Sequence, residues 1–431
     1  MLALLLVVVE GAIRKWDSRF SEGIPRYLAY FSKDIVFGLL LLLPVQNVFS
    51  AANTEFGRWL WPGCLLFAVG GGLSCVYGFN AVGALLTVRA AVVLPVVAFL
   101  AVRRLGGVPV RHVAWLLAAL TALNFGLAIV QNHLPGDHFL NKYATEMENV
   151  VELDSGVRAT GTFSYISGLG VMSGVGIWAG LALLSLSRRP WEQVGGYVAL
   201  AAGLGCGLAS VSRGPVVIDL AMVVVWMVAS RVGHRLIGRS VLAVVLVAGL
   251  AWGIGSVATF SRLGQDLLKR NEQAGDTIQE RAFGQLAEAG EAIESEVQGR
   301  GLGTEQVGGN YARSGEMTFT TYESQLPRIV LETGVAGLVG FLVICGGALW
   351  ALQRARREAS AREENAMLLA TQLLLLPMFY SNIIFNHTTS AFVWMIFAVV
   401  LANVAPRAAT TKQPSRKKFK SKSSPSAAVM Q

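Results

Sequence analysis

The sequence predicts an all-α protein that crosses a membrane many times, and three observations support this class. Hydrophobic residues make up 53% of the 431 positions, and the mean hydropathy is +0.52. Charged residues account for only 15% of the chain, whereas soluble domains usually contain about 25%. The apolar stretches, such as 39–49, 241–260 and 368–384, are continuous rather than alternating, which favours helices over a β-barrel.

Hydropathy places about twelve membrane spans along the chain, by the rule of roughly 20 apolar residues per span. We expect them at 1–13, 35–50, 59–78, 84–101, 113–133, 163–186, 194–210, 215–230, 240–260, 327–352, 366–385 and 388–404. The expected organisation is spans 1–9 within 1–260, a large loop at 261–325, spans 10–12 within 326–404 and a basic tail at 405–431.

Arginine clusters mark alternate short connections and so place them in the cytoplasm. They lie within 103–111, 188–189, 231–239 and 354–362. The tail 405–431 adds seven basic residues and no acid, so both termini are expected inside and the tail is expected to be disordered beside anionic lipid. Without the tail, the net charge of +9 falls to +2 (9 minus 7), and we therefore expect no nucleic-acid partner.

Two polar segments are expected on the opposite, outer face. The loop 14–34 carries five basic residues although the topology places it outside, and we interpret this exception as functional. The loop 261–325 holds eleven of the 27 acids. Its apolar spacing over 278–297 predicts an amphipathic helix, which either lies on the membrane surface or packs within the loop, and 299–303 predicts a turn.

Charged residues inside expected spans are costly and tend to mark function. Here they are Glu10, Arg89, Asp219 and Glu332, each within about two helical turns of the outer end of its span. Outer helix ends also carry arginines, whose planar guanidinium group binds phosphate oxygens and stays charged. This depth suits a lipid-linked pyrophosphate; pairing with nearby acids or with lipid phosphate is the alternative interpretation.

Three short motifs then carry a resemblance to a known family. Ser212-Arg213-Gly214-Pro215 occupies an expected outer turn, and Arg281 precedes the 299–303 turn in the long loop. Glu323-Ser324 is followed, after nine intervening residues, by Gly334-Val335-Ala336-Gly337. With about twelve expected spans, the chain resembles the O-antigen ligase / O-antigen polymerase superfamily. Residues 10–16 also resemble the opening of ligase-like proteins from exopolysaccharide systems.

The resemblance implies a metal-independent glycosyltransferase without a cofactor, multi-pass in the bacterial inner membrane, with its active face in the periplasm. Such an enzyme transfers or polymerises glycan from a polyprenyl-pyrophosphate donor onto a saccharide hydroxyl. Its expected partners are the lipid-linked glycan, the saccharide acceptor, membrane lipids and other polysaccharide assembly proteins. By resemblance, Arg213 and Arg281 bind the pyrophosphate.

The remaining candidate residues have less direct support. Glu323 stands where the ligases have a histidine that is proposed as the base, and a buried carboxylate can also take a proton. His387 is a second candidate base, with an interfacial histidine as the alternative. Arg158 is expected to face the substrate, with a helix-flanking charge as the alternative. Arg328 and Glu332, spaced i, i+4, are expected to pair and to act in positioning.

Two other functions fit the same composition. One is a transporter or flippase for a lipid-linked sugar, although such proteins usually place their site near the midplane of the bilayer. The other is a non-catalytic scaffold of a polysaccharide assembly complex. The cysteines form no pair or Cys/His cluster typical of a metal site, so they are interpreted as packing residues: Cys64, Cys75, Cys206 and Cys345.

Overall fold

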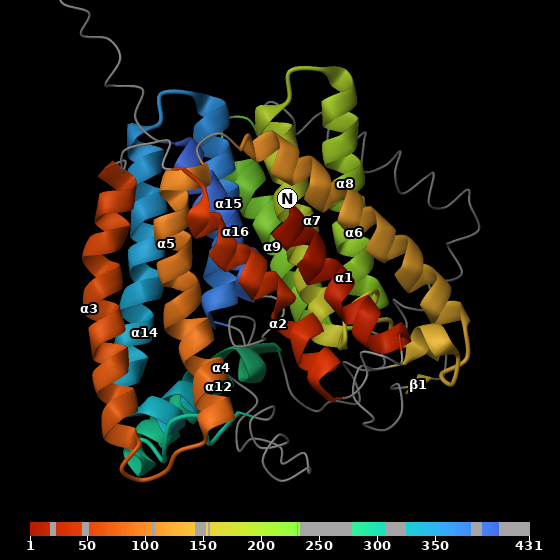
Figure 1. Ribbon diagram of the computed structural model, residues 1–431. Helices are drawn as coiled ribbons and strands as arrows, with labels where there is room; N and C mark the ends of the chain where they lie inside the picture. The colour runs from red at the N-terminus through yellow and green to blue at the C-terminus, as the bar shows by residue number, and fades with distance from the viewer. Residues whose placement is uncertain are drawn as a thin grey trace, which may run out of the picture.

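The computed structural model of the chain is built almost entirely from helices (Figure 1). It describes residues 1–17, 23–44, 51–105, 108–142, 152–153, 156–230, 232, 278–306, 325–380 and 390–404. Within these ranges the strands form one small antiparallel ribbon, β1 (Glu152–Leu153) with β2 (Gly156–Val157). The predicted all-α class is therefore confirmed.

The helices that the structure describes follow in this order along the chain. The first half of the chain contains α1 (Leu2–Trp16), α2 (Gly23–Leu39), η2 (Leu40–Leu42), α3 (Ala51–Ser74), α4 (Ala81–Val88), η3 (Arg89–Val93), α5 (Leu94–Leu105), α6 (Val110–His133), η4 (Phe139–Asn141) and α7 (Ile166–Leu186). The second half contains α8 (Pro190–Ala209), α9 (Arg213–Ala229), α12 (Ile278–Ser295), α14 (Gln325–Glu358), α15 (Arg362–Tyr380) and α16 (Ser390–Asn403).

Among the described residues, four helical segments are long and apolar enough to cross a membrane. They are Ala81–Leu105, which joins α4, η3 and α5, together with Val110–His133, Ile166–Leu186 and Gln325–Glu358. Shorter apolar helices lie at Gly214–Ala229 and Ser390–Asn403. These segments agree with the predicted membrane protein, because a span needs roughly 20 apolar residues.

Helices α3 and α14 lie side by side and pack through small residues (Figure 1). A Cβ atom added at Gly63 would lie 2.6 Å from the Ile344 side chain. One added at Gly70 would lie 2.4 Å from the Thr333 carbonyl oxygen. Since apolar surface gains little from leaving lipid, this close approach stabilises the pair mainly through van der Waals contact.

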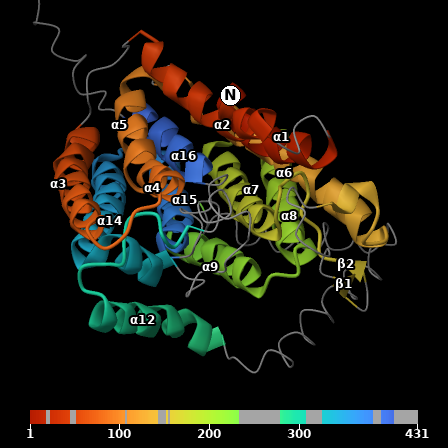
Figure 2. The same cartoon turned by 60° about the horizontal axis from the view of Figure 1, so that its bottom comes forward.

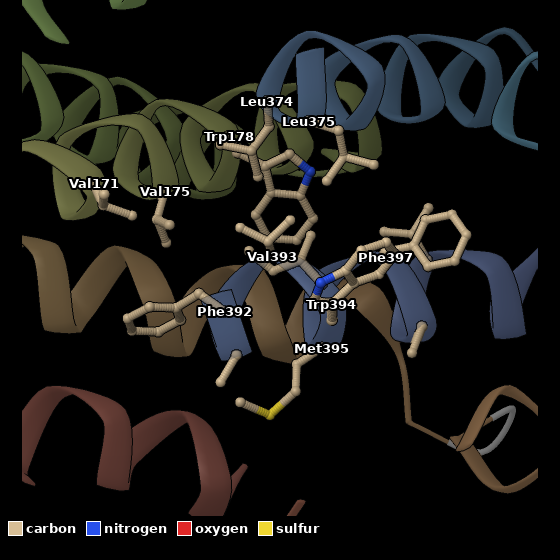
Figure 3. Packing of buried hydrophobic residues seen from close by; sticks show 14 of the residues in the cluster. Val171, Val175, Trp178, Leu374, Leu375, Phe392, Val393, Trp394, Met395 and Phe397 are labelled. Carbon is tan, nitrogen blue, oxygen red and sulfur yellow. The ribbon is translucent and has the colours of Figure 1, made fainter. Parts of the chain in front are cut away.

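Helix α16 occupies the centre of the helical bundle. All its residues from Ser390 to Ala402 are buried, as expected of a helix that is apolar on every side. Figure 3 shows Trp394 and Phe397 of α16 beneath Trp178 of α7 and the leucines of α15. The buried indole nitrogen of Trp178 donates to Thr371 Oγ1 at 2.9 Å, so this polar atom of the core is satisfied.

The connections between helices gather at two opposite ends of the bundle (Figure 1). We call one the loop end; it contains 75–80, 158–165, 210–212 and 297–306, with Asn80 N donating to Leu302 O and Ala159 N donating to Ala209 O. We call the other the basic end; there Arg111 pairs with Glu192, and Asn403 donates to Val108 O. Among the described residues, the connections predicted to be basic thus lie at one end of the bundle, and the alternate connections lie at the other.

The prediction of a loop over 14–34 is wrong. Helix α1 continues to Trp16 and α2 begins at Gly23, so most of this segment is helical. Both helices lie across one side of the bundle (Figure 2). Hydropathy missed α2 because the segment contains charged residues, and one of them, Lys33, is buried by its pair with Glu10 of α1. The expected span 240–260 and the basic tail 405–431 lie outside the described residues.

Candidate functional site

Four charged side chains are buried toward the loop end of their helices, at the positions that the sequence singles out. Glu10, Asp219 and Glu332 are each 1% exposed, and Arg89 is 5% exposed. A charge removed from water is stable only when it is paired or hydrogen-bonded. The partners of each charge therefore define the polar structure of this end.

A cluster of ion pairs joins α1, α2 and η3, and we call it the α1–α2 cluster. Glu10 accepts a hydrogen bond from Arg14 Nη1 at 2.8 Å and another from Lys33 Nζ at 3.0 Å. Asp34, the next residue along α2, accepts two from Arg89, with Nε at 2.9 Å and Nη2 at 2.7 Å. A two-pronged arginine–carboxylate pair is strong and geometrically specific.

Lys15 links α1 to the loop that precedes α7. Its Nζ donates to Thr160 Oγ1 at 2.6 Å and to the Gly161 carbonyl at 3.0 Å. The amide side chain of Gln131 accepts from the backbone nitrogens of Thr160 and Gly161 and so fixes that loop. The basic residues of α1 that break the charge rule are therefore engaged in internal contacts at the loop end.

The turn between α8 and α9 carries the first family motif. Arg158 Nε donates to the Ser210 carbonyl at 3.1 Å, and Arg158 Nη2 donates to Ser212 Oγ at 2.9 Å. Arg213 follows as the first residue of α9. The structure thus brings Arg158 against the turn that sets the position of Arg213, although the two are far apart in sequence.

Asp219 lies deeper in the same helix, where α7, α8 and α9 meet. The hydroxyl of Ser173 on α7 donates to its Oδ2. The Cα of Gly207 on α8 comes close enough that an added Cβ would lie 3.7 Å from the same oxygen. Because Asp219 is less than two turns beyond Arg213, it adds a buried carboxylate beneath the motif.

A second cluster surrounds the start of α14, and we call it the α14 cluster. Glu332 Oε2 accepts a hydrogen bond from Thr87 Oγ1, and the expected ion pair with Arg328 forms at 3.7 Å. Arg328 Nη2 also donates to Gln306 Oε1 at 2.8 Å, and Gln306 Nε2 donates to Thr87 Oγ1 at 2.7 Å. This cluster ties α14 to α4 and to the segment after α12.

The long polar segment contacts α14 at a break in that helix. Gly334 has φ 65° and ψ −175°, which interrupts the helical backbone. The amide of Val335 donates to Val297 O at 2.9 Å, and Arg300 N donates to Leu331 O at 2.6 Å. Helix α12, which forms where the amphipathic pattern predicts, ends just before this contact and carries Arg281 in its first turn.

Some predicted site residues fall beyond what the structure describes. Glu323 and His387, the candidate bases, lie outside the described residues. Arg213 and Arg281 have described helical positions, but their side-chain surroundings lie outside the described part of the chain. Among the described residues, no group of three or more His, Cys, Asp or Glu side chains is arranged to hold a metal ion.

Sequence reasoning missed several partners of the buried charges. Asp34 accepts hydrogen bonds from Arg89, and Ser173 donates one to Asp219. Gln306 accepts one from Arg328. The adjacent charges of Lys33 and Asp34, directly before an apolar run, could have indicated that α2 carries partners for the buried charges. Charged residues at a membrane boundary need such partners. Ser173 and Gln306 had no comparable signal.

In comparisons with known proteins, no family model matches the chain, and no curated protein matches it either.

Proposed function

We propose that the protein is a C-type glycosyltransferase of the O-antigen ligase / O-antigen polymerase type. It transfers or polymerises glycan from a polyprenyl-pyrophosphate donor onto a saccharide hydroxyl. The observation that carries the proposal is the 210–213 turn, which Arg158 holds at the loop end and which places Arg213 at the amino end of α9. A helix amino terminus and an arginine both favour an anion at that point.

The chemistry assigns a role to each candidate residue. The acceptor hydroxyl oxygen attacks the anomeric carbon of the donor sugar, and the bond from that carbon to the pyrophosphate oxygen breaks. The pyrophosphate leaves with the electron pair, and Arg213 and Arg281 stabilise its growing negative charge. Glu323 takes the proton of the acceptor hydroxyl, with His387 as the second candidate for that step.

The α14 cluster bears on the role proposed for Glu323, which itself lies outside the described residues. That residue lies two positions before α14 begins at Gln325. Arg328 and Glu332 hold the first turns of α14 in place through their hydrogen bonds to Gln306 and Thr87. The position at which α14 begins is therefore fixed. Arg328 and Glu332 therefore act as positioning residues in the proposal.

The proposal includes a membrane topology. The chain crosses the bacterial inner membrane about twelve times, by the apolar-length rule. The loop end faces the periplasm, and the basic end, with Arg354 and Arg111, faces the cytoplasm. A lipid-linked donor fits this orientation because its prenyl chain stays in the bilayer while its pyrophosphate lies at the level of the buried charges.

The test is turnover of a lipid-linked oligosaccharide by purified protein in nanodiscs. We expect release of polyprenyl pyrophosphate, and about a 100-fold loss of turnover in Arg213→Ala and in Arg281→Ala, as for other donors to a developing anion. Arg300→Ala is the matched control, because Arg300 is also at the loop end but its side chain is exposed and pairs with Glu296. That variant should keep normal turnover.

Other outcomes would replace the proposal. Unchanged turnover in both arginine variants would remove their assigned role. Movement of intact donor across the bilayer without bond cleavage would indicate a flippase. Normal polymer output in cells that carry Arg213→Ala and Glu323→Ala would indicate a scaffold. When turnover is observed, a ladder of products distinguishes a polymerase from a ligase, which gives a single transfer.

A further inference from the structure

A strained residue stands two positions before Arg213. Val211 has φ +48°, and among the residues that the structure describes it is the one non-glycine residue with positive φ. Its side chain is fully buried. A β-branched residue in the left-handed region is a genuine outlier, and such strain persists only where surrounding contacts hold it.

The amide of Val211 donates to Leu208 O at 2.9 Å, and Arg158 adds contacts on either side of this residue. The Arg158 guanidinium group donates to the carbonyl of Ser210, just before Val211, and to the hydroxyl of Ser212, just after it. The neighbouring Ala159 amide donates to Ala209 O at 3.2 Å. The segment at 158–159 thus contacts the backbone or side chains on both sides of the strained residue.

From this arrangement we infer that Arg158 is a positioning residue, which holds Val211 in its left-handed conformation and thereby fixes the direction in which Arg213 enters α9. The inference rests on the proposed function and refines it: Arg213 binds pyrophosphate, whereas Arg158 keeps the turn in the shape that presents Arg213. The two hydrogen bonds offset the conformational cost of a valine at this position.

This role makes a specific prediction about glycine. Without Arg158 the turn loses two of the hydrogen bonds that flank Val211, so the preference of valine for negative φ acts against a weaker set of contacts. Glycine has no Cβ and adopts positive φ at little cost, so Val211→Gly should keep the turn formed even without Arg158. If Arg158 instead binds the donor directly, no substitution at position 211 can replace it.

The experiment is a double substitution measured by turnover of the lipid-linked donor. Arg158→Ala should lower kcat by about 10- to 100-fold, the factor that a lost hydrogen bond from a charged donor represents. Adding Val211→Gly should restore most of that loss. Val211→Ala is the matched control: it also shortens the buried side chain but retains a Cβ, so adding it should restore far less. A double variant with Val211→Gly that stays as slow as Arg158→Ala would overturn the inference.

A second measurement separates this inference from the proposed function. Hydrogen exchange at the backbone amides of 209–214 reports the turn directly, whether or not the protein turns over a donor. Arg158→Ala should speed exchange there, and the added Val211→Gly should slow it again. If wild-type protein cleaves no donor, the proposed function fails while exchange still decides the role of Arg158. Unchanged exchange in Arg158→Ala would reject the positioning role.

Should Arg158→Ala not accumulate in membranes, Ser212→Ala is tested in the same way, because it removes one of the two hydrogen bonds from Arg158.

Discussion

Two ion pairs, one at each end of the helical bundle, use the same types of charged group at very different exposure. At the loop end, Glu10 and Lys33 pair at 3.0 Å with both side chains fully buried. At the basic end, Glu55 and Arg354 pair at 2.6 Å, but the Arg354 side chain is 42% exposed. The distances are similar, so exposure rather than geometry separates the two pairs.

Exposure decides what each pair contributes. A buried charge that loses its partner leaves the other charge without compensation in a low dielectric, which is strongly destabilising. An exposed pair is screened by water and salt and contributes little. Glu10 and Lys33 have therefore kept their charges despite the cost of burial, as expected of a functional site, whereas the exposed Arg354 charge carries little such cost.

The largest effect expected from this comparison is at Glu10. Glu10→Ala removes the carboxylate that Arg14 and Lys33 share, and should lower the free energy of unfolding by about 3–5 kcal/mol. Denaturant titration in mixed micelles measures it. Glu10→Gln keeps a hydrogen-bond acceptor without the charge and should cost less. A loss below about 1 kcal/mol in Glu10→Ala, typical of exposed pairs, would erase the difference between the two ends.

A smaller but still large effect is expected at Gly334, where the backbone rather than charge shapes the loop end. Its φ of 65° and ψ of −175° suit glycine, and an added Cβ would lie 2.7 Å from Val297 O. Gly334→Ala should therefore cost about 2–3 kcal/mol, measured by the same titration. Gly346, in the same helix, is the control, because an added Cβ meets nothing within 4 Å. Gly346→Ala should be neutral or stabilising, and equal losses at both glycines would contradict the assignment.

The smallest effect is expected at Arg354. Arg354→Ala should change the free energy of unfolding by about 1 kcal/mol or less, because the pair with Glu55 is partly exposed. A double-mutant cycle with Glu55→Ala, run at low and at high salt, sharpens the comparison. The coupling energy of this pair should fall with salt, whereas that of Glu10 with Lys33 should barely change. A salt-independent coupling at Arg354 would mean that the basic end is as well shielded as the loop end.

The sequence predicted helices well where the apolar run is long and uniform. The expected spans 113–133 and 163–186 correspond closely to α6 (Val110–His133) and α7 (Ile166–Leu186). The sequence failed at α2, where charged residues interrupt the apolar pattern and hydropathy gives no sign that one of them is buried. Lys33 shows this, since its burial depends on Glu10 from another helix.

The candidate site was predictable only in part. A charge inside an apolar run is visible in the sequence, and so Glu10, Arg89, Asp219 and Glu332 could be singled out. Their partners could not, because the hydrogen bond from Gln306 to Thr87 joins residues 219 positions apart, and the sequence contains no record of that approach. The role of Arg158 depends in the same way on a turn that is distant in the chain.

The amino-acid sequence by itself determined that this chain is helical, apolar and asymmetric in its basic residues, because these properties depend on composition and local spacing. Only the tertiary structure decided which charges meet, that Val211 is strained, and that α12 ends against a break in α14. Such contacts depend on how helices cross in space, and many arrangements of the same helices would satisfy the same local pattern.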